Sequence, residues 1–377
     1  ENKMKLMHLG DLHVGKSLGE FSLIEDQRYI LDRIVDIISD IRPDGVLICG
    51  DVYDRAAPGD EAVRVLDEFL TGLFHLGVDI YMISGNHDSA SKLSFASKIL
   101  DDMKLHISPV YDGRVTPYTI KKDISVNIYM LPFIKPSNIK AAFPEVMIDG
   151  YTEALKYAIE KMDIDENHIN ILLSHQYVNG ALRTDSEDIS IGGLDGVPVS
   201  VFDGFDYVAL GHLHKPQSVG RDTIRYAGSP LKYSASETDH EKSITVIDIQ
   251  GKNKIKTEII PLKPLRDMIK IKGGYDTLMS RSYLEKTDTD SYIHAILTDE
   301  EDVPDALSKL RTVYPHIMSL RYENKRTSEN REITPDEKIN IKSPIEIWEE
   351  FYETQNNKKM SEEQRKISTE LIKKIWS

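Results

Sequence analysis

Five short apolar segments of this chain each end in a polar cluster that contains Asp, Asn or His, and this repeated pattern constrains the fold more than any other feature. The segments span residues 5–9, 45–49, 79–83, 169–174 and 207–210, and they read as buried strands. The clusters that follow them contain, in chain order, Asp11 and His13, Asp51 and Asp54, Asn86 with His87 and Asp88, His175, and His212 with His214. Ligands of open α/β sheets bind outside the carboxyl ends of the strands. We therefore expect these side chains to share one site at one sheet edge.

Helical patterns lie between several of these strands. Apolar residues recur with a 3.6-residue period across residues 30–41 and 63–73. Alternating strands and helices predict a layered α/β domain. Segments 115–120 and 125–131, and later 244–249 and 256–260, look like hairpins. We expect a mixed sheet, or two such sheets packed as a sandwich between helices.

The 377 residues suggest two or three domains. Pro261 and Pro264 mark a boundary, so residues 1–264 are expected to form the main domain. Residues 265–323 then alternate strand (268–271), helix (275–284), strand (292–297), helix (304–313) and strand (317–322), which predicts a small α+β unit. The charged residues 324–342 read as a linker, and residues 343–377 as two closing helices.

The residue types in the clusters indicate metal ligands. Carboxylate and amide oxygens with imidazole nitrogens, and no thiolate, suit Mn²⁺, Fe²⁺ or Zn²⁺. There are too many candidate ligands for one ion, and two ions about 3.5–4 Å apart are the usual arrangement for displacement at a phosphate ester. A single Asp-x-His or a lone histidine would more often be structural, but the five clusters in this order favour metal binding. Gly10, Gly50, Gly85 and Gly211 each precede a candidate ligand, where a missing Cβ lets the backbone approach the site.

These motifs resemble the signature of the calcineurin-like metallophosphoesterases. The stretches 11–16, 50–55, 84–89, 211–216 and 226–231 narrow the likeness to the SbcD-type nucleases, and it continues through residues 344–352 to cover nearly the whole chain. The resemblance implies a sandwich of mixed sheets flanked by helices, with a small α+β capping domain and a C-terminal helical pair.

The resemblance also assigns roles to particular residues. One metal would take Asp11, His13, Asp51 and His214, and the other would take Asp51, Asn86, His175 and His212, with Asp51 bridging the two. His87 would be catalytic, donating a proton toward the leaving oxygen. The family prefers Mn²⁺, and Mg²⁺ is a possible substitute. Archaeal and eukaryotic relatives carry a histidine at the position of Asp54, so we expect Asp54, like Asp88, to be a hydrogen-bonding neighbour of the site and not a ligand.

The function implied by the resemblance is that of a DNA nuclease. It would be a 3′–5′ exonuclease and single-strand endonuclease within an ATP-dependent complex that processes double-strand breaks, hairpins and blocked ends. The partner would be an SbcC-type coiled-coil ATPase bound through residues 343–377, with a homodimer of this chain inside a heterotetramer. The chain has no Gly-x-x-x-x-Gly-Lys-[Ser/Thr] motif of its own. The closing helices carry both tryptophans of the chain, Trp348 and Trp376, and fit helix-in-groove binding, although they could also fold back on the main domain.

The net charge of −15 argues against DNA binding by this chain alone, because domains that bind nucleic acid usually carry a basic face. A partner that supplies most phosphate contacts would resolve this, with a local basic strip drawn from Lys92, Lys98, Arg183, Lys215 and Lys232. The longest apolar runs are far shorter than the ~20 residues that span a bilayer, so no membrane segment is expected. With Cys49 as the only cysteine, no internal disulfide can form, which fits a cytoplasmic protein. The resemblance to DNA nucleases implies that it is associated with the nucleoid.

Two other functions stay open at this stage. The same ligands serve many phosphoester reactions, so the chain could be a metallophosphoesterase of a small molecule or a phosphoprotein. A stand-alone phosphatase needs neither the cap nor the tail, which disfavours this alternative. A non-catalytic scaffold that docks DNA ends or the ATPase is disfavoured by the intact ligand set.

Overall fold

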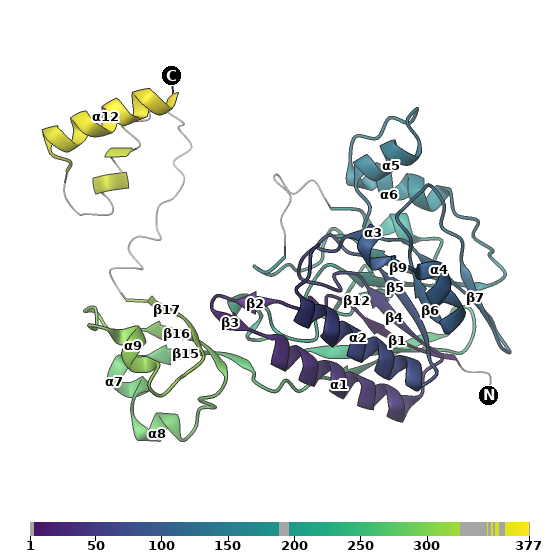
Figure 1. Cartoon of the computed structure of the whole chain (residues 1–377), viewed down its shortest axis with the longest axis horizontal. Helices are drawn as coiled ribbons and strands as arrows, with labels where there is room; N and C mark the ends of the chain where they lie inside the picture. Colours follow the sequence, from purple (N-terminus) through teal and green to yellow (C-terminus); the bar gives the residue numbers. More distant parts are fainter. Residues whose placement is uncertain are drawn as a thin grey trace. The chain divides into compact units, whose positions relative to one another are not determined.

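The computed structural model describes residues 4–187, 196–324, 345, 348–349, 351–353 and 359–376. The chain divides into two compact units, residues 1–322 and residues 323–377. The predicted linker, residues 324–342, lies outside the described residues except for Asn324. Figure 1 shows the arrangement of the helices and strands.

The first unit is built on two six-stranded mixed sheets. One sheet has the strand order β14-β13-β1-β4-β5-β6, in which β1, β4, β5 and β6 are parallel. Its strands are β1 (Met4–Leu9), β4 (Gly45–Cys49), β5 (Asp79–Ile83), β6 (Leu105–Ile107), β13 (Ser243–Ile249) and β14 (Ile255–Pro261). The other sheet has the order β11-β12-β10-β9-β8-β7, in which β8, β9, β10 and β12 are parallel. Its strands are β7 (Tyr118–Lys121), β8 (Ser125–Met130), β9 (Ile169–His175), β10 (Tyr207–Gly211), β11 (Gln217–Val219) and β12 (Arg221–Tyr226).

Alternating side chains place each sheet between two apolar layers. In β1, Met4 and Leu6 belong to a core shared with the second sheet, whereas Met7 and Leu9 belong to a core on the opposite face. The period of two along a strand produces this division. Because the central strands are buried on both faces, their sequences are continuous apolar runs, without the polar alternation of a half-exposed strand. This explains why the sequence pattern located them well.

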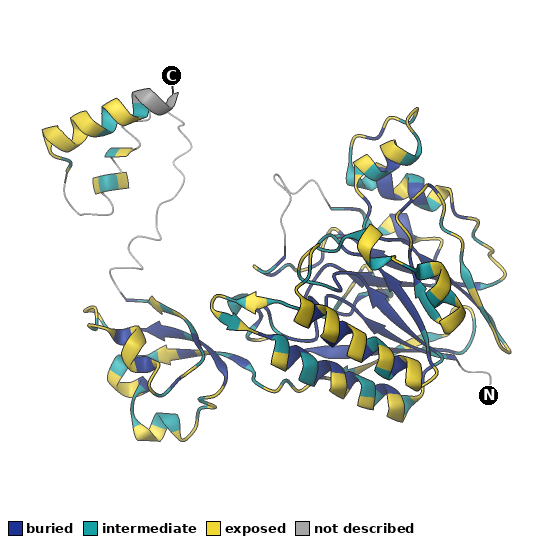
Figure 2. Ribbon diagram, in the orientation of Figure 1, coloured by how far each residue is buried: buried dark blue, intermediate teal, exposed yellow. Residues whose placement is uncertain are grey.

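Helices cover both outer faces of the sandwich. The residues of α1 (Ile24–Ile41) and α2 (Asp60–His75) pack on the first sheet, and those of α5 (Pro136–Ala142) and α6 (Tyr151–Glu160) pack on the second. The strands are mostly buried while the outward faces of α1 and α2 are exposed (Figure 2). The expected sandwich of mixed sheets flanked by helices is therefore confirmed.

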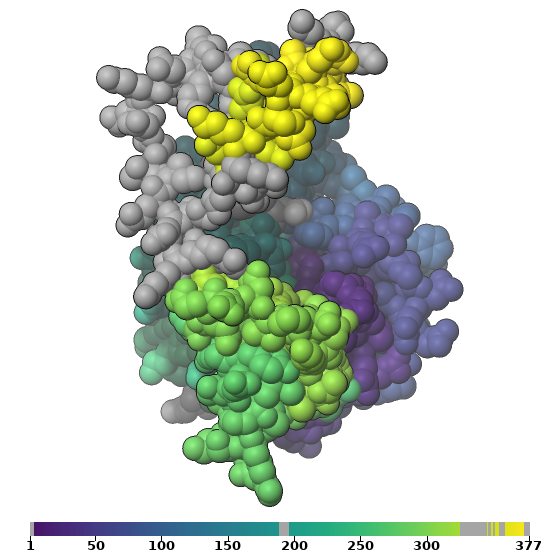
Figure 3. All heavy atoms as spheres, turned by 90° about the vertical axis from the view of Figure 1, so that its left-hand side faces the viewer, coloured from purple at the N-terminus to yellow at the C-terminus, as the bar shows by residue number. Residues whose placement is uncertain are grey.

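Residues 268–322 form a small lobe with its own core, seen in green in Figure 3. Its three-stranded parallel sheet has the order β15-β16-β17. The elements are β15 (Met268–Gly273), α7 (Tyr275–Leu278), α8 (Arg281–Leu284), β16 (Tyr292–Leu297), α9 (Ala306–Leu310) and β17 (Ile317–Tyr322). The lobe is joined to α1 through the buried Asp26, which accepts hydrogen bonds from Arg266 (2.9 Å) and from the hydroxyl of Tyr292 (2.8 Å).

The predicted elements match closely, with two differences in the small lobe. The helix predicted over residues 275–284 is interrupted at Ser280, whose extended backbone (ψ 142°) begins the separate helix α8. The helix predicted over residues 304–313 is shorter, because Asp305 adopts a left-handed conformation (φ 54°) that helix interiors do not allow. The two predicted hairpins are present as β7–β8 and β13–β14.

In the second unit, α12 (Glu362–Trp376) follows a short helical segment that includes Trp348, Glu349 and residues 351–353. Within the described part of the chain, no helix is both long enough and apolar enough to cross a membrane.

Candidate metal centre

The candidate residues come together where the two sheets lie side by side. Asp11 and His13 follow β1, Asp51 follows β4, and Asn86 and His87 follow β5, all in the first sheet. His175 ends β9, and His212 and His214 follow β10, in the second sheet. The sequence pattern predicted that all of them lie at the edge of a single sheet. That placement was wrong in one respect, because the sandwich brings the carboxyl ends of two sheets to the same place.

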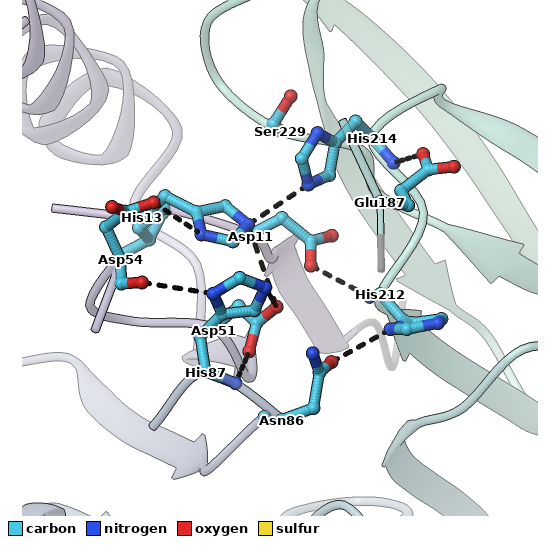
Figure 4. Close-up of polar contacts among 12 residues, drawn as sticks. Asp11, His13, Asp51, Asp54, Asn86, His87, Glu187, His212, His214 and Ser229 are labelled. Carbon is cyan, nitrogen blue, oxygen red and sulfur yellow. Dashed lines mark hydrogen bonds and ion pairs between the residues drawn. The ribbon is translucent and has the colours of Figure 1, made fainter. Parts of the chain in front are cut away.

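One group of donors surrounds His13 (Figure 4). Its Nε2 lies 3.0 Å from His214 Nε2 and 3.6 Å from Asp51 Oδ2. Ligand atoms of Asp11, His13 and His214 all lie within 4.8 Å of one another, and all three residues are buried. Imidazole Nε2 atoms facing each other at this distance suit a shared cation, to which each ring can offer a lone pair.

A second group of donors surrounds Asn86. Its Oδ1 lies 3.0 Å from His175 Nε2 and 3.0 Å from His212 Nδ1. Asp51 Oδ2 lies 3.3 Å from the same His175 nitrogen. One oxygen of Asp51 therefore faces His13 in the first group and His175 in the second, while its other oxygen accepts the backbone N–H of His87 (2.9 Å).

The backbone at four of these positions is strained. Asp11, His13, Asp51 and His212 have φ values of 53°, 44°, 46° and 98°, in the left-handed region that side-chain-bearing residues rarely adopt. Such conformations cost on the order of 1–3 kcal/mol each and cluster at functional sites. They lie directly after β1, β4 and β10, where they turn the chain and direct the side chains inward.

Three glycines allow the close approach of these turns. A Cβ on Gly50, whose φ is 83°, would lie 2.4 Å from His175 Nδ1. A Cβ on Gly85 would lie 2.1 Å from Asp51 Oδ1, and a Cβ on Gly211 would lie 1.8 Å from the Cys49 carbonyl oxygen. No side chain fits at any of these distances. Gly10 differs from them, because a Cβ there would make only ordinary contacts of 3.5 Å or more. The close-approach explanation therefore applies to Gly50, Gly85 and Gly211 and not to Gly10.

The charge distribution of the pocket fits a divalent cation. Burial raises the pKa of Asp11 to about 7 despite the nearby His175 and His214, and among the described residues the buried Asp11 Oδ2 has no hydrogen-bond partner. Burial also opposes ionisation of Asp51, but attraction to His175 and His13 holds its pKa well below the ordinary value. An unpartnered buried carboxylate oxygen is costly, and a cation would satisfy it. The residues present therefore fit two divalent metals.

Hydrogen bonds behind the rings set which nitrogen faces the pocket. His175 Nδ1 donates to the backbone carbonyl of Cys49 (2.8 Å), which directs its Nε2 toward Asn86 and Asp51. Such partners fix the tautomer and orientation of metal-binding histidines. His13 Nδ1 lies 3.6 Å from Asp54 Oδ1, so the carboxylate of Asp54 stands behind a candidate ligand.

His87 lies at the mouth of the pocket, with 21% of its side chain exposed. Its Nδ1 donates to the backbone carbonyl of Asp54 (3.0 Å), and its Nε2 lies 3.9 Å from Asp51 Oδ2. Asp88 accepts backbone N–H groups of Val52, Tyr53 and Gly85, which ties together the loops after β4 and β5. Asp54 and Asp88 thus contact the neighbours of the pocket from outside it.

Comparison with known proteins identifies the family. Residues 4–216 match the family model of the calcineurin-like phosphoesterases, and residues 264–356 match the SbcD_C model, described as the type 5 capsule protein repressor C-terminal domain. A relative from Staphylococcus epidermidis, named as the SbcD component of the nuclease SbcCD, is 36% identical over 321 residues, which cover 84% of this chain and 85% of that protein. The chain belongs to the SbcD branch of the calcineurin-like phosphoesterases.

Solved structures give more remote likenesses to this SbcD-type chain. A dimetal phosphatase from Danio rerio is 12% identical with a TM-score of 0.39, and covers 69% of this chain and 99% of its own. The protein TT1561 of Thermus thermophilus is also 12% identical, with a TM-score of 0.38, and covers 68% of this chain and 99% of its own.

The SbcD-type site also contains residues that sequence reasoning missed. Glu187 Oε1 accepts the backbone N–H of His214 (2.7 Å), and the side chains of Ser186 and Glu237 approach the ring of the same histidine. Glu237 and Lys242 lie in the stretch 234–243, whose hydrophilic residues read as a solvated loop. Only the neighbouring stretch 226–231, which resembles the family, indicated that this region matters.

The proposed basic strip is only partly available. Lys232 has 12% of its side chain exposed and pairs with Asp267 (2.8 Å), so it serves the junction with the small lobe. Lys92 Nζ donates to the carbonyl of Ala56, next to the loop that carries Asp54. The guanidinium of Arg183 stacks on the ring of Tyr177 at 3.3 Å.

Proposed function

We propose that this chain is a two-metal DNA nuclease. The observation that carries the proposal is the position of Asp51 Oδ2, 3.6 Å from His13 Nε2 and 3.3 Å from His175 Nε2, which joins two donor groups through one oxygen. A bridging carboxylate of this kind is typical of two-metal phosphoesterases. The choice of DNA is supported by the relative named as a nuclease, which matches most of this chain.

Asp11, His13, Asp51 and His214 would hold one divalent metal, and Asp51, Asn86, His175 and His212 would hold the other. Bound there, the two metals would supply Lewis acids that activate water and neutralise phosphate charge. We propose Mn²⁺ in both positions, with Mg²⁺ as a weaker substitute, since oxygen and imidazole donors suit Mn²⁺.

His87 would act as the general acid. The carbonyl of Asp54 accepts a hydrogen bond from Nδ1–H, which leaves Nε2 as the nitrogen directed toward the metal pocket. When the ring is protonated, Nε2 can donate to the oxygen that leaves the phosphate. A 3′-alkoxide is a poor leaving group, so this proton would contribute about 10²–10⁴-fold to the rate.

The test is digestion of a linear DNA duplex with one labelled end, in Mn²⁺, in Mg²⁺ and in chelator. We expect cleavage in Mn²⁺, little in Mg²⁺ and none in chelator, and the position of the label reports the proposed 3′–5′ polarity. A hairpin and a single-strand circle test the endonuclease activity. Cleavage of bis-p-nitrophenyl phosphate with no cleavage of any DNA, with or without an SbcC-type ATPase, would favour a phosphoesterase of small molecules or phosphoproteins.

An apolar surface near the site supports a homodimer. Ile99 lies in α4 (Ser97–Leu100) and is 71% exposed, and Phe95 precedes this helix and is 80% exposed. Met103 and Phe74 beside them are also exposed. Side chains of α2 and of residues 92–107 line a groove there. Exposed apolar patches of this kind mark interaction sites. We propose that a second copy of this chain covers it.

We predict that Phe95→Glu combined with Ile99→Glu converts the dimer to a monomer. Burial of each side chain is worth about 1.5–3 kcal/mol, and two charges in the interface would raise the dimer Kd more than about 100-fold. Analytical ultracentrifugation measures the change, with Met147→Glu, at another exposed apolar position, as the control. A wild-type chain that is monomeric at micromolar concentration would contradict the proposal.

The second unit supports a docking segment. The rings of Trp348 and Phe351 stack at 5.6 Å, and Trp348 Nε1 donates to Ser368 Oγ of α12 (3.1 Å). Even so, Trp348, Phe351, Ile367 and Leu371 are all exposed. We propose that residues 343–377 bind the coiled coil of an SbcC-type ATPase. Residues 265–323 would cap the nuclease domain, which spans residues 1–264. Residues 324–342 would link the capping domain to the tail. A heterotetramer of two chains of each kind would follow.

Deleting residues 343–377 is predicted to abolish co-purification with the ATPase and to leave Mn²⁺-dependent cleavage of bis-p-nitrophenyl phosphate unchanged. The metal pocket lies wholly in residues 11–214, so its chemistry does not need the tail. Pull-down with the tagged ATPase and initial rates on the ester measure the two effects. Unchanged co-purification would exclude the tail as the docking segment.

A further inference from the structure

A buried pair of opposite charges lies behind the metal pocket and has no role in the function described so far. Lys242 is 5% exposed and Glu237 is fully buried, with 2.6 Å between Nζ and Oε2. Removing two ions from water costs several kcal/mol per ion, so a buried pair is weak evidence of a stabilising role. Its contacts suggest a different role, because both residues reach His214.

The contacts hold His214 from three sides. Lys242 Nζ donates to the backbone carbonyl of His214 (2.8 Å), and Glu187 accepts the backbone N–H (2.7 Å). On the ring side, Nδ1 lies 2.8 Å from Ser186 Oγ and 3.4 Å from Glu237 Oε1. Ser186 Oγ lies 2.5 Å from the same Glu237 oxygen.

The direction of these hydrogen bonds follows from the chemistry of each group. Lys242 Nζ donates to Glu237 Oε2 at 2.6 Å in a buried ion pair, so Glu237 is a carboxylate that only accepts hydrogen bonds. The hydroxyl of Ser186 must therefore donate to Glu237, and its oxygen then accepts from His214. Nδ1 thus carries the proton, and Nε2 presents its lone pair toward His13 Nε2, 3.0 Å away.

His175 and His13 are held differently. The Nδ1 of His175 uses a backbone carbonyl, and that of His13 faces the nearby Asp54 at 3.6 Å. The partners of His214 come from two separate segments, residues 186–187 and 237–242, which no strand of the site contains. Side chains are needed here because, among the described residues, no backbone carbonyl hydrogen-bonds to this ring nitrogen.

We propose that Ser186 and Glu237 are positioning residues that fix the Nδ1–H tautomer of His214, so that its Nε2 binds a divalent cation, and that the ion pair with Lys242 holds the Glu237 carboxylate in place. The inference rests on the proposed metal role of His214. It predicts a hydrogen-bond chain with one direction, from the ring through the serine hydroxyl to the carboxylate. Partners of this kind typically change metal affinity by about 10–100-fold.

The test compares Ser186→Ala, Ser186→Thr and Glu237→Gln with the full-length wild type by calorimetric titration of Mn²⁺. Alanine removes the hydroxyl without leaving a buried charge unpaired, whereas threonine restores the hydroxyl. Glutamine keeps the shape, but its amide can donate to Ser186 and so allow the chain to reverse. Ser282→Ala, on the exposed surface of α8, is the matched control.

We expect Ser186→Ala and Glu237→Gln to weaken one of the two Mn²⁺ sites by about 10–100-fold and to leave the other unchanged, whereas the threonine and control variants match wild type. The rate on bis-p-nitrophenyl phosphate should recover at saturating Mn²⁺, because the metal is bound less tightly but in the same place. Thermal melts establish folding, and Ser186→Ala decides the outcome if Glu237→Gln fails to fold. Unchanged Mn²⁺ affinity in folded Ser186→Ala would overturn this inference and leave the proposed function standing. A wild type that binds no Mn²⁺ would instead overturn the proposed function, and this inference with it.

Discussion

Replacing Asp51 with asparagine is expected to abolish cleavage and the binding of both metals together. Asp51 Oδ2 faces both donor groups, at 3.6 Å from His13 Nε2 and 3.3 Å from His175 Nε2. Asparagine has nearly the same shape but no charge, and its neutral amide oxygen bridges two cations far more weakly than a carboxylate oxygen does. We expect the rate to fall at least about 1,000-fold, equivalent to roughly 4 kcal/mol in the barrier.

Metal-dependent stability provides a second measurement for this variant. A ligand that binds the folded state stabilises it by about 2.7 kcal/mol at 100 times its Kd. Mn²⁺ should therefore raise the melting temperature of the wild type by several degrees and that of Asp51→Asn much less. Asp40→Asn, the same change on the exposed side of α1, should behave as wild type in both measurements. If Asp51→Asn still bound two Mn²⁺ ions per chain, Asp51 would not be the bridge.

The parts of the site that sequence predicted are those that follow buried strands. The runs before Asp11, Asp51 and His175 are apolar because their strands are covered on both faces, so their ends could be located to within a residue or two. Where a strand ends, the type of the next polar residue indicates a ligand. The donor groups around His13 and Asn86 therefore contain every residue that the sequence nominated as a ligand, although their binding of metal stays a prediction.

Other features depend on contacts between distant segments, which leave little trace in one sequence. Glu237 and Lys242 are charged residues in a polar stretch, and only the fold reveals that they are buried behind His214. The left-handed conformations of Asp11 and Asp51 are imposed by packing, since local preference opposes them. The break of the small-lobe helix at Ser280 is equally invisible to periodicity, because the apolar spacing continues across it.

The largest selective effect is expected from His87→Asn. His87 lies beside the metal pocket, and its Nε2 is 3.9 Å from Asp51 Oδ2. It is not needed as a ligand, because the second donor group already contains His175, His212 and Asn86. Removing its imidazole should leave both metals bound and remove only the proton donor. We expect cleavage of DNA to fall by about 10²–10⁴-fold while Mn²⁺ titration gives wild-type affinity.

The leaving group distinguishes a proton donor from a residue that merely shapes the pocket. An acid is needed to expel a 3′-alkoxide from DNA, whereas p-nitrophenolate leaves without one. His87→Asn should therefore lose much more activity on DNA than on bis-p-nitrophenyl phosphate. The control His75→Asn, the same change on the exposed end of α2, should keep wild-type activity on both substrates. Equal losses on the two substrates would mean that His87 positions the phosphate and does not protonate it. Full activity of His87→Asn on DNA would remove it from the mechanism, because no general acid can be replaced by an amide without a cost to the rate.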